Sequence, residues 1–271
     1  MKYSPQRSSL EAWIEARQGR GLYWFTRHLA EAELGMSAAA FRMAVRRLEK
    51  KTSVTRVYRD FYVVVPPEHR AVGSLPADWF ITDLMAYLNR PFYVGLLTAA
   101  AYHGAAHQRP EKFHVITSVP MREIRCGSVA VRFFVKRDPA RTPQQSITVQ
   151  TGYIPVSTPE ATALDLLRHA RSIGGLNHVL TVLQELGEQM DGKKLADVAK
   201  LDGTRGMALA QRLGWLLEKA GYNGQAVELA EWVKCKNPVP TKLYPLTPAR
   251  GSVLDKRWNL WLNGEVEGDL G

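Results

Sequence analysis

The most constraining feature of the sequence is an amphipathic segment near the N-terminus that is followed at once by β-like runs. Ser37 opens this segment, and Phe41, Val45 and Leu48 then fall within one narrow helical arc. One face of the helix is therefore expected to pack while the other carries positive charge. The basic side chains on the opposite side are Arg42, Arg46, Arg47 and Lys50.

Helical signals precede this basic helix and a hairpin signal follows it. Apolar residues recur at helical spacing after Ser9, and Thr26 is a candidate cap for a second helix. Residues 54–58 and 61–65 are rich in β-branched and aromatic side chains and are separated by two residues. Helix, helix, basic helix and hairpin in this order predict a winged helix-turn-helix, whose third helix enters the DNA major groove.

Net charge supports a polyanionic partner. The chain has 36 Lys and Arg against 26 Asp and Glu, a formal charge of +10, and its pI is about 9.7. Residues 1–72 alone hold 13 basic and 7 acidic side chains, or +6, whereas residues 73–271 hold 23 and 19, or +4. Such a domain attracts nucleic acid or an acidic membrane surface by Coulomb steering. Combined with the order of the elements, the charge favours double-stranded DNA.

A second module is predicted after a segment rich in proline, glycine and charge at residues 66–76. The predicted fold class is α+β, with a winged helix-turn-helix in residues 1–70 and a larger domain in residues 71–271. That domain is expected to hold a small sheet in about 92–156 and helices in about 159–235. The expected elements are a helix in 78–88, an extended piece and helix in 92–102, strands in 113–118, 129–135 and 147–156, and helices in 161–170, 176–186, 195–201, 208–220 and 225–233.

Motifs for catalysis or for cofactor binding are absent from the sequence. There is no GxxxxGK[ST] or GxGxxG loop for phosphates and no Gly-x-Ser-x-Gly elbow. His103 and His107 have the i, i+4 spacing of zinc ligands, but Gly104 replaces the glutamate of the zinc-protease helix, so both are interpreted as structural. Cys126 and Cys235 have no partner cysteines nearby in the sequence. We therefore predict no catalytic, cofactor or metal site.

Two carboxylates in the segment that follows Thr158 and Pro159 are given non-catalytic interpretations. Glu160 suits the positive end of a helix that Thr158 caps. Asp165 lies roughly 140° further around that helix, so the two would converge poorly as a catalytic pair. Asp165 is left with two interpretations, a bond to a neighbouring helix or domain and a solvated surface position.

No segment predicts association with a membrane. The longest uncharged run, residues 91–108, is interrupted by glycine and histidine, and residues 1–14 lack a continuous apolar stretch. We therefore expect a cytoplasmic protein.

Three stretches in a fixed order carry a family resemblance: the hairpin end Arg59-Asp60-Phe61-Tyr62, the segment from Tyr93 to Gly104, and the segment from Thr158 to Leu167. The chain resembles the AbiEi antitoxins of bacterial abortive-infection toxin–antitoxin systems. The resemblance implies an N-terminal winged helix that represses its own operon at inverted repeats in promoter DNA. It also implies a C-terminal domain that counters a nucleotidyltransferase toxin, in many members without a stable complex (type IV).

The resemblance carries a DNA-contact role to positions of the third helix and the hairpin. Two positions depart from the family, since Asp60 stands where the hairpin usually has glycine and Lys51-Thr52 where a helix-ending glycine is common. A second class stays open, a phosphoryl- or nucleotide-processing enzyme that a winged helix directs to nucleic acid. The lack of a catalytic constellation favours the antitoxin. The predicted DNA-binding residues are Ser37, Arg42, Arg46, Arg47, Lys50, Arg56 and Arg59.

Overall fold

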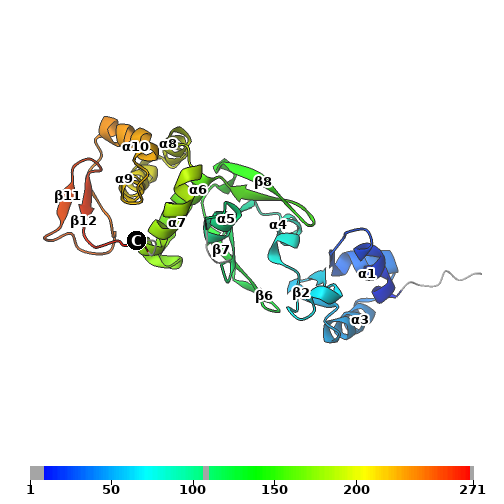
Figure 1. Cartoon of the computed structure of the whole chain (residues 1–271). Helices are drawn as coiled ribbons and strands as arrows, with labels where there is room; N and C mark the ends of the chain where they lie inside the picture. Colours follow the sequence, from blue (N-terminus) through cyan, green and yellow to red (C-terminus); the bar gives the residue numbers. More distant parts are fainter. Residues whose placement is uncertain (1–8, 106–109, 269–271) are drawn as a thin grey trace, which may run out of the picture. The chain divides into compact units, whose positions relative to one another are not determined.

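The computed structural model describes residues 9–105 and 110–268. Within them the chain is an α+β protein, as predicted, and it divides into two compact units (Figure 1). Unit 1 comprises Met1–Phe92, Glu111–Arg137 and Ser146–Ile154, and unit 2 comprises Tyr93–Pro110, Asp138–Gln145 and Pro155–Gly271. The predicted boundary near residue 70 stays a prediction. None of the described helices is both long and apolar enough to cross a bilayer.

The N-terminal part of unit 1 contains three helices and a small sheet. The predicted cap Thr26 is confirmed, and Ser9 and Ser37 cap the helices that they were expected to begin, because each of the three side-chain oxygens accepts the backbone N–H three residues further on at 3.2 Å. Each cap satisfies one of the N–H groups that a helix start leaves without an intrahelical partner. The elements are α1 (Leu10–Gln18), β1 (Trp24–Thr26), α2 (Arg27–Leu34), α3 (Ala38–Lys50), β2 (Val54–Tyr58) and β3 (Phe61–Val64).

One hydrophobic core joins these helices to the sheet. The predicted packing face of α3 is confirmed, since Phe41, Val45 and Leu48 are all buried. Phe25 of β1 stacks on Tyr62 of β3 with ring centroids 5.4 Å apart. Burying each large apolar side chain contributes roughly 1.5–3 kcal/mol. This packing fixes α3 by one side and leaves its other side to solvent.

The sheet has the order β1-β3-β2 and is antiparallel throughout. The predicted hairpin is β2 and β3, joined through Arg59 and Asp60. Both departures from the family pattern fall on left-handed backbone, because Thr52 has φ 52° and Asp60 has φ 59°. Aspartate tolerates this region better than most residues. The Asp60 carboxylate also lies 3.4 Å from Nε of Arg27, which ties the hairpin to α2.

Thr52 is the more strained of the two positions because its side chain is β-branched. We expect Thr52→Gly to raise the free energy of unfolding by roughly 0.5–1 kcal/mol, the relief of left-handed strain exceeding the extra chain entropy of glycine. Chemical denaturation of the full chain measures the change. Thr52→Ala is the control, since it keeps Cβ and should gain much less. An equal gain from alanine would contradict the strain.

The remainder of unit 1 contains short helices and three strands. In it β5 pairs in parallel with β7, and β6 pairs with β7 in antiparallel. The helix predicted in 78–88 is confirmed over residues 81–87, but its start is wrong, because Phe80 at φ −129° separates a 3₁₀ turn from the α-helix. The elements are η1 (Pro67–His69), η2 (Ala77–Trp79), α4 (Ile81–Tyr87), β5 (Phe113–Thr117), β6 (Ile124–Cys126) and β7 (Val129–Val135).

Four further elements and a 3₁₀ turn precede α6 in the chain, and residues 146–154 of β8 and β9 belong to unit 1. The single strand predicted in 147–156 is wrong, because a turn at Gln150 and Thr151 divides this region into two neighbouring strands. Val94 pairs in parallel with Val156. The elements are β4 (Phe92–Val94), α5 (Leu96–Tyr102), η3 (Pro139–Arg141), β8 (Gln144–Val149) and β9 (Gly152–Ser157).

The helical part of unit 2 follows the prediction closely, but the chain then forms a small sheet that the sequence did not predict. In that sheet the order is β10-β12-β11, and Trp258 beside it is fully buried. A Cβ on Gly214 of α9 would lie 2.0 Å from the Trp258 ring, so the close packing requires glycine. The elements are α6 (Pro159–Arg168), η4 (Ala170–Ser172), α7 (Gly175–Leu186), η5 (Gly187–Gln189), α8 (Gly192–Leu201), α9 (Gly203–Lys219), α10 (Asn223–Lys236), β10 (Thr241–Lys242), β11 (Val253–Asp255) and β12 (Leu260–Leu262).

Candidate functional site

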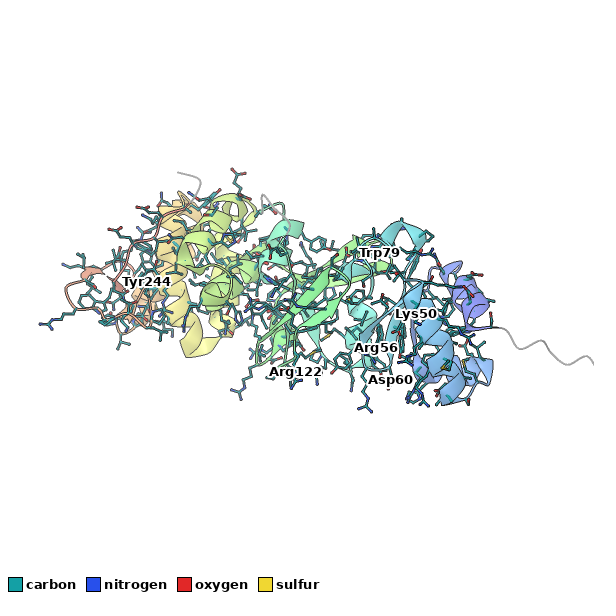
Figure 2. The ribbon with its side chains drawn as sticks, turned by 90° about the horizontal axis from the view of Figure 1, so that it is seen from below. Lys50, Arg56, Asp60, Trp79, Arg122 and Tyr244 are labelled. Carbon is teal, nitrogen blue, oxygen red and sulfur yellow. The ribbon has the colours of Figure 1, made fainter. Side chains whose placement is uncertain are left out.

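The seven residues predicted to bind DNA are all exposed, five on α3 or its cap and two on the hairpin. At about 100° per residue, Arg42, Arg46 and Lys50 fall within an arc of roughly 80°, and Arg47 lies about 60° further round. We call these four side chains the cationic face of α3. Helix α3 contacts β2, and Lys50, Arg56 and Asp60 appear in the same part of unit 1 (Figure 2). The seven are Ser37, Arg42, Arg46, Arg47, Lys50, Arg56 and Arg59.

The cationic face carries charge that the protein itself leaves largely unbalanced. Among the described residues, no carboxylate lies within ion-pair distance of its four side chains or of Arg56. Arg59 differs, because its Nε lies 3.8 Å from Asp60, although the Arg59 side chain is 92% exposed. At that exposure the ion pair is weak and screened by salt. The surface is therefore electropositive and open to an anionic partner.

Met43 belongs to the same surface and was missed by the sequence analysis. It is 55% exposed and lies between Lys50 and Arg47 around the helix. A methionine at a helix position usually signals core packing, so its type gave no indication of this exposure. Its flexible apolar side chain suits the C5-methyl group that thymine presents in the major groove.

The hairpin is held by residues beyond the predicted N-terminal domain. The Tyr87 hydroxyl donates to the Arg59 carbonyl at 3.4 Å, and the Tyr87 ring lies 5.5 Å from Phe61. The Thr55 hydroxyl donates to the Gly73 carbonyl at 2.6 Å. The position of the hairpin therefore depends on α4 and on the segment that follows η1.

Unit 2 contains a buried polar network at the end of α6. The Tyr93 hydroxyl donates to Oδ2 of Asp165 at 2.6 Å, and Nε of Arg168 lies 3.8 Å from Oδ1 of Asp165. Arg168 also pairs with Asp202. Burial, followed by the Asp165 carboxylate, raises the pKa of Tyr93 well above its usual value, so the phenol stays protonated and donates. Because Asp165 is fully buried, its interpretation as a solvated surface position is wrong, and its hydrogen bond with Tyr93 joins it to strand β4 and not to a neighbouring helix or domain.

A second buried group surrounds His103 at the end of α5. Nε2 of His103 lies 2.8 Å from the Ser157 carbonyl, which can only accept, so Nε2 carries the proton and Nδ1 accepts from Gln145 at 3.3 Å. Burial lowers the pKa of His103, which keeps the ring neutral. The structural interpretation of His103 is therefore confirmed, whereas His107 lies outside the described residues. Among the described residues, no three metal-ligating side chains gather at one point.

Glu160 does more than the sequence indicated. It is buried, and its Oε1 accepts the backbone N–H of Asp191 at 3.1 Å, just before α8. The Asp191 side chain in turn accepts the N–H of Lys194 and caps α8. The start of α6 therefore fixes the start of α8.

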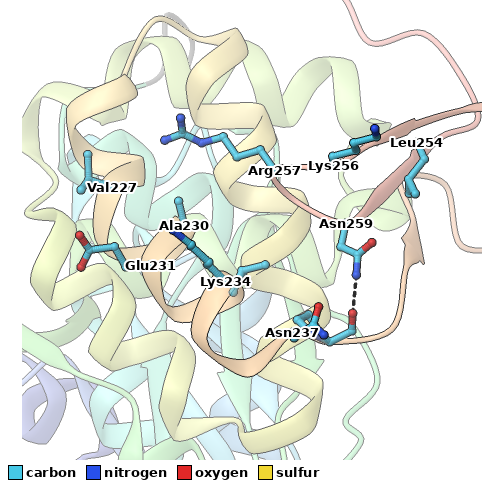
Figure 3. Close-up of a pocket in the computed structure, with 11 residues that line it drawn as sticks. Val227, Ala230, Glu231, Lys234, Asn237, Leu254, Lys256, Arg257 and Asn259 are labelled. Carbon is cyan, nitrogen blue, oxygen red and sulfur yellow. Dashed lines mark hydrogen bonds between the residues drawn. The ribbon is translucent and has the colours of Figure 1, made fainter.

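A pocket of about 720 Å³ lies between α10 and the segment that joins β11 to β12 (Figure 3). Lys234, Lys256 and Arg257 line it, and Asn259 donates to the Pro238 carbonyl. Arg257 is already paired with Glu218 at 2.8 Å, and a lysine in the last turn of α10 favours the helix dipole without a ligand. The charges of Arg257 and Lys234 in this α10 pocket are thus explained within the protein.

Comparison with protein families finds a match for the middle of the chain, over residues of both units. Residues 93–219 match the model of the AbiEi antitoxin C-terminal domain. This stretch is therefore similar to the AbiEi antitoxins, and we call it the AbiEi domain. The match includes Tyr93, His103, Asp165 and Arg168, so both buried networks lie inside the AbiEi domain and include residues of two stretches that carried the resemblance. An antitoxin role in a toxin–antitoxin system is supported by this match.

The whole fold has a counterpart among solved structures. The crystal structure of the Rv2827c protein from Mycobacterium tuberculosis aligns with a TM-score of 0.63, covering 94% of this chain and 92% of that one at 17% identity. At this identity the likeness concerns the fold alone. No curated protein matches the sequence. The AbiEi match ends at residue 219, so α10 and the C-terminal sheet lie beyond the matched residues.

Proposed function

We propose that this protein is an antitoxin that represses its own operon by binding inverted repeats in promoter DNA through a winged-helix N-terminal domain. The cationic face of α3 carries the proposal. One side of α3 packs against the core, and the basic side chains on its other side have no ion-pair partners among the described residues. The recognition helix of a winged-helix domain has the same arrangement and lies in the DNA major groove. Arginine pairs bidentately with guanine there, and lysine neutralises phosphate.

The roles we propose for the seven residues differ along the surface. Arg42 and Arg46, which precede the last turn of α3, contact base edges, while Lys50, Arg56 and Arg59 hold phosphates. Ser37 stands at the N-terminus of α3, where a backbone phosphate is favoured. Arg47, at the side of the cationic face, completes the basic surface.

For the AbiEi domain we propose that it neutralises a nucleotidyltransferase toxin encoded in the same operon. The support is the family match together with the resemblance, which implies action without a stable complex. In this function the protein would act in the cytoplasm as part of phage defence. The sequence of the adjacent gene tests the toxin assignment directly. An adjacent gene that encodes no nucleotidyltransferase would contradict the assignment.

Binding of the full chain to its own promoter should fall steeply with salt. Each phosphate neutralised by Lys or Arg releases counterions, so the logarithm of the binding constant falls by about 0.9 per contact for each unit in the logarithm of salt concentration. Gel shift or fluorescence anisotropy across a salt series measures the slope. The full chain is required because Tyr87 and Gly73 hold the hairpin.

A scrambled duplex of equal length is the control for this measurement. It should bind more weakly than the promoter at every salt concentration, because base contacts are lost while phosphate contacts remain. Equal affinity for both duplexes, or an affinity that salt does not change, would reject the repressor function.

A further inference from the structure

A second hollow in unit 2, of about 910 Å³, differs from the α10 pocket in its charge. Its walls are the end of α6 with η4, the start of α7, part of α9 and the segment Leu243–Thr247. We call it the α7 cleft. Its volume lies within the range of small-molecule sites. Among the described residues that line it, three are arginines, Arg168, Arg171 and Arg212, and none carries a carboxylate.

These arginines are not equivalent. Arg168 is balanced by Asp165 and Asp202 of the buried network. For Arg171 and Arg212, by contrast, the described part of the chain places no carboxylate within ion-pair distance. The cleft therefore holds two positive charges that the protein does not neutralise.

Arg212 is the more informative of the two because it is half-buried. Its Nε donates to the Lys242 carbonyl at 2.7 Å and its Nη2 to the Thr241 hydroxyl at 3.0 Å. These bonds use two of the five N–H donors of a guanidinium and fix its orientation, but neither acceptor is charged. Burial lowers the pKa of Arg212, because a charged guanidinium is less stable away from water than in it. A bound anion would offset that cost.

The remaining walls add a weak anion preference and an apolar surface. Helix α7 starts in the wall at Gly175 with no side-chain cap and no acidic residue in its first turn. Leu209 and Leu243 are buried, while Leu246 is 71% exposed and lines the same cleft. An anionic group alone would leave this apolar wall unused.

We propose that the α7 cleft binds a nucleoside phosphate, with Arg171 and Arg212 on the phosphate groups and the wall at Leu246 against the base. Guanidinium groups match phosphate oxygens by paired hydrogen bonds. A nucleobase is flat and largely apolar on its faces, which suits a leucine wall. This binding function goes beyond DNA repression, involves no covalent step, and stands or falls independently of the proposed repressor role.

Isothermal titration calorimetry on the full chain, at about 150 mM salt to screen surface charge, tests the proposal. The probes are ATP, GTP, CTP, UTP, tripolyphosphate and uncharged guanosine. We expect at least one triphosphate to bind about tenfold more tightly than tripolyphosphate. No heat with any triphosphate, or equally tight binding of tripolyphosphate, would overturn the proposal.

Variants assign the binding to the cleft. Arg171→Glu changes an exposed residue and should weaken triphosphate binding at least about tenfold, because charge-assisted bonds to phosphate are lost. Leu246→Ala should bring the affinity for the triphosphate close to that for tripolyphosphate. Lys234→Glu makes the same charge change in the α10 pocket and should leave affinity unchanged. Unchanged binding in Arg171→Glu, or equal loss in Lys234→Glu, would overturn the assignment.

A further variant tests whether the triphosphate binds to the cationic face of α3 instead of the α7 cleft. A chain carrying Arg42→Ala and Arg46→Ala should keep its full affinity for the triphosphate, because neither residue belongs to unit 2. Loss of triphosphate binding in that variant would overturn the proposal and place the ligand on the cationic face.

Discussion

Replacing Asp165 with alanine is expected to lower the free energy of unfolding by about 3 kcal/mol, the size of effect seen when one partner of a buried ion pair is removed. The carboxylate is fully buried, accepts the Tyr93 hydroxyl and lies beside Arg168. Its removal leaves the buried Tyr93 hydroxyl without a hydrogen-bond acceptor and removes one of the two carboxylates that balance the positive charge of Arg168. Chemical denaturation of the full chain measures the loss.

The chain contains a matched control for this substitution. Asp197 pairs with Lys200 at 3.0 Å with the same i, i+3 spacing as Asp165 and Arg168, but both side chains are exposed. Asp197→Ala should therefore change stability by at most about 0.5 kcal/mol. Similar losses in the two variants would show that burial of the network contributes little.

Tyr93 adds a pH dependence with a defined sign. Its pKa is higher in the folded chain than its usual value near 10, because burial and Asp165 disfavour the phenolate. The contribution of Tyr93 to the free energy of unfolding is therefore fully present below about pH 10 and declines as the pH rises above that value. Tyr93→Phe removes the hydrogen bond to Asp165, so the variant should lack this decline in stability at alkaline pH. Denaturation curves of both proteins at pH 8 and above measure the difference.

The helices were predicted well where polar caps and apolar periodicity agree. Thr26 and Thr158 cap the helices that the sequence assigned to them, and Ser37 lies at the start of α3 as expected. The strands were predicted less well because the missed ones are only two to three residues long. β6, β10 and β12 are too short for alternation to be visible. β8 and β9 were merged because the turn between them has no proline and its glycine lies at the start of β9.

The candidate sites show the same division between local and tertiary information. The cationic face of α3 could be predicted because spacing along one helix decides which residues share a side. The Tyr93–Asp165 bond could not, because its partners are 72 residues apart and nothing in the sequence pairs them. The α7 cleft was also invisible, since it forms from α6, α9 and a segment beyond residue 242. Arg212 appears from sequence as an ordinary helix arginine.

Replacing Arg42 and Arg46 with alanine is expected to weaken operator binding by at least about 2 kcal/mol, or roughly 30-fold, because each base-contacting arginine contributes about 1–3 kcal/mol. The loss on a scrambled duplex should be much smaller, since the phosphate contacts that we propose for Lys50, Arg56 and Arg59 remain. Anisotropy titrations on both duplexes measure the difference. Arg250→Ala, an exposed arginine of unit 2, is the control and should bind the operator like the parent chain.

The same surface separates repression from antitoxicity when Arg47→Ala is added. The triple variant should derepress a promoter reporter yet still rescue cells that express the toxin from an unrelated promoter, because the AbiEi domain is unchanged. It should fold normally, since exposed substitutions usually cost within about 0.5 kcal/mol and alanine favours helix. Circular dichroism verifies the fold. Loss of rescue by the folded triple variant would mean that antitoxicity itself requires the cationic face, and the proposed division of labour between the two parts of the chain would be wrong.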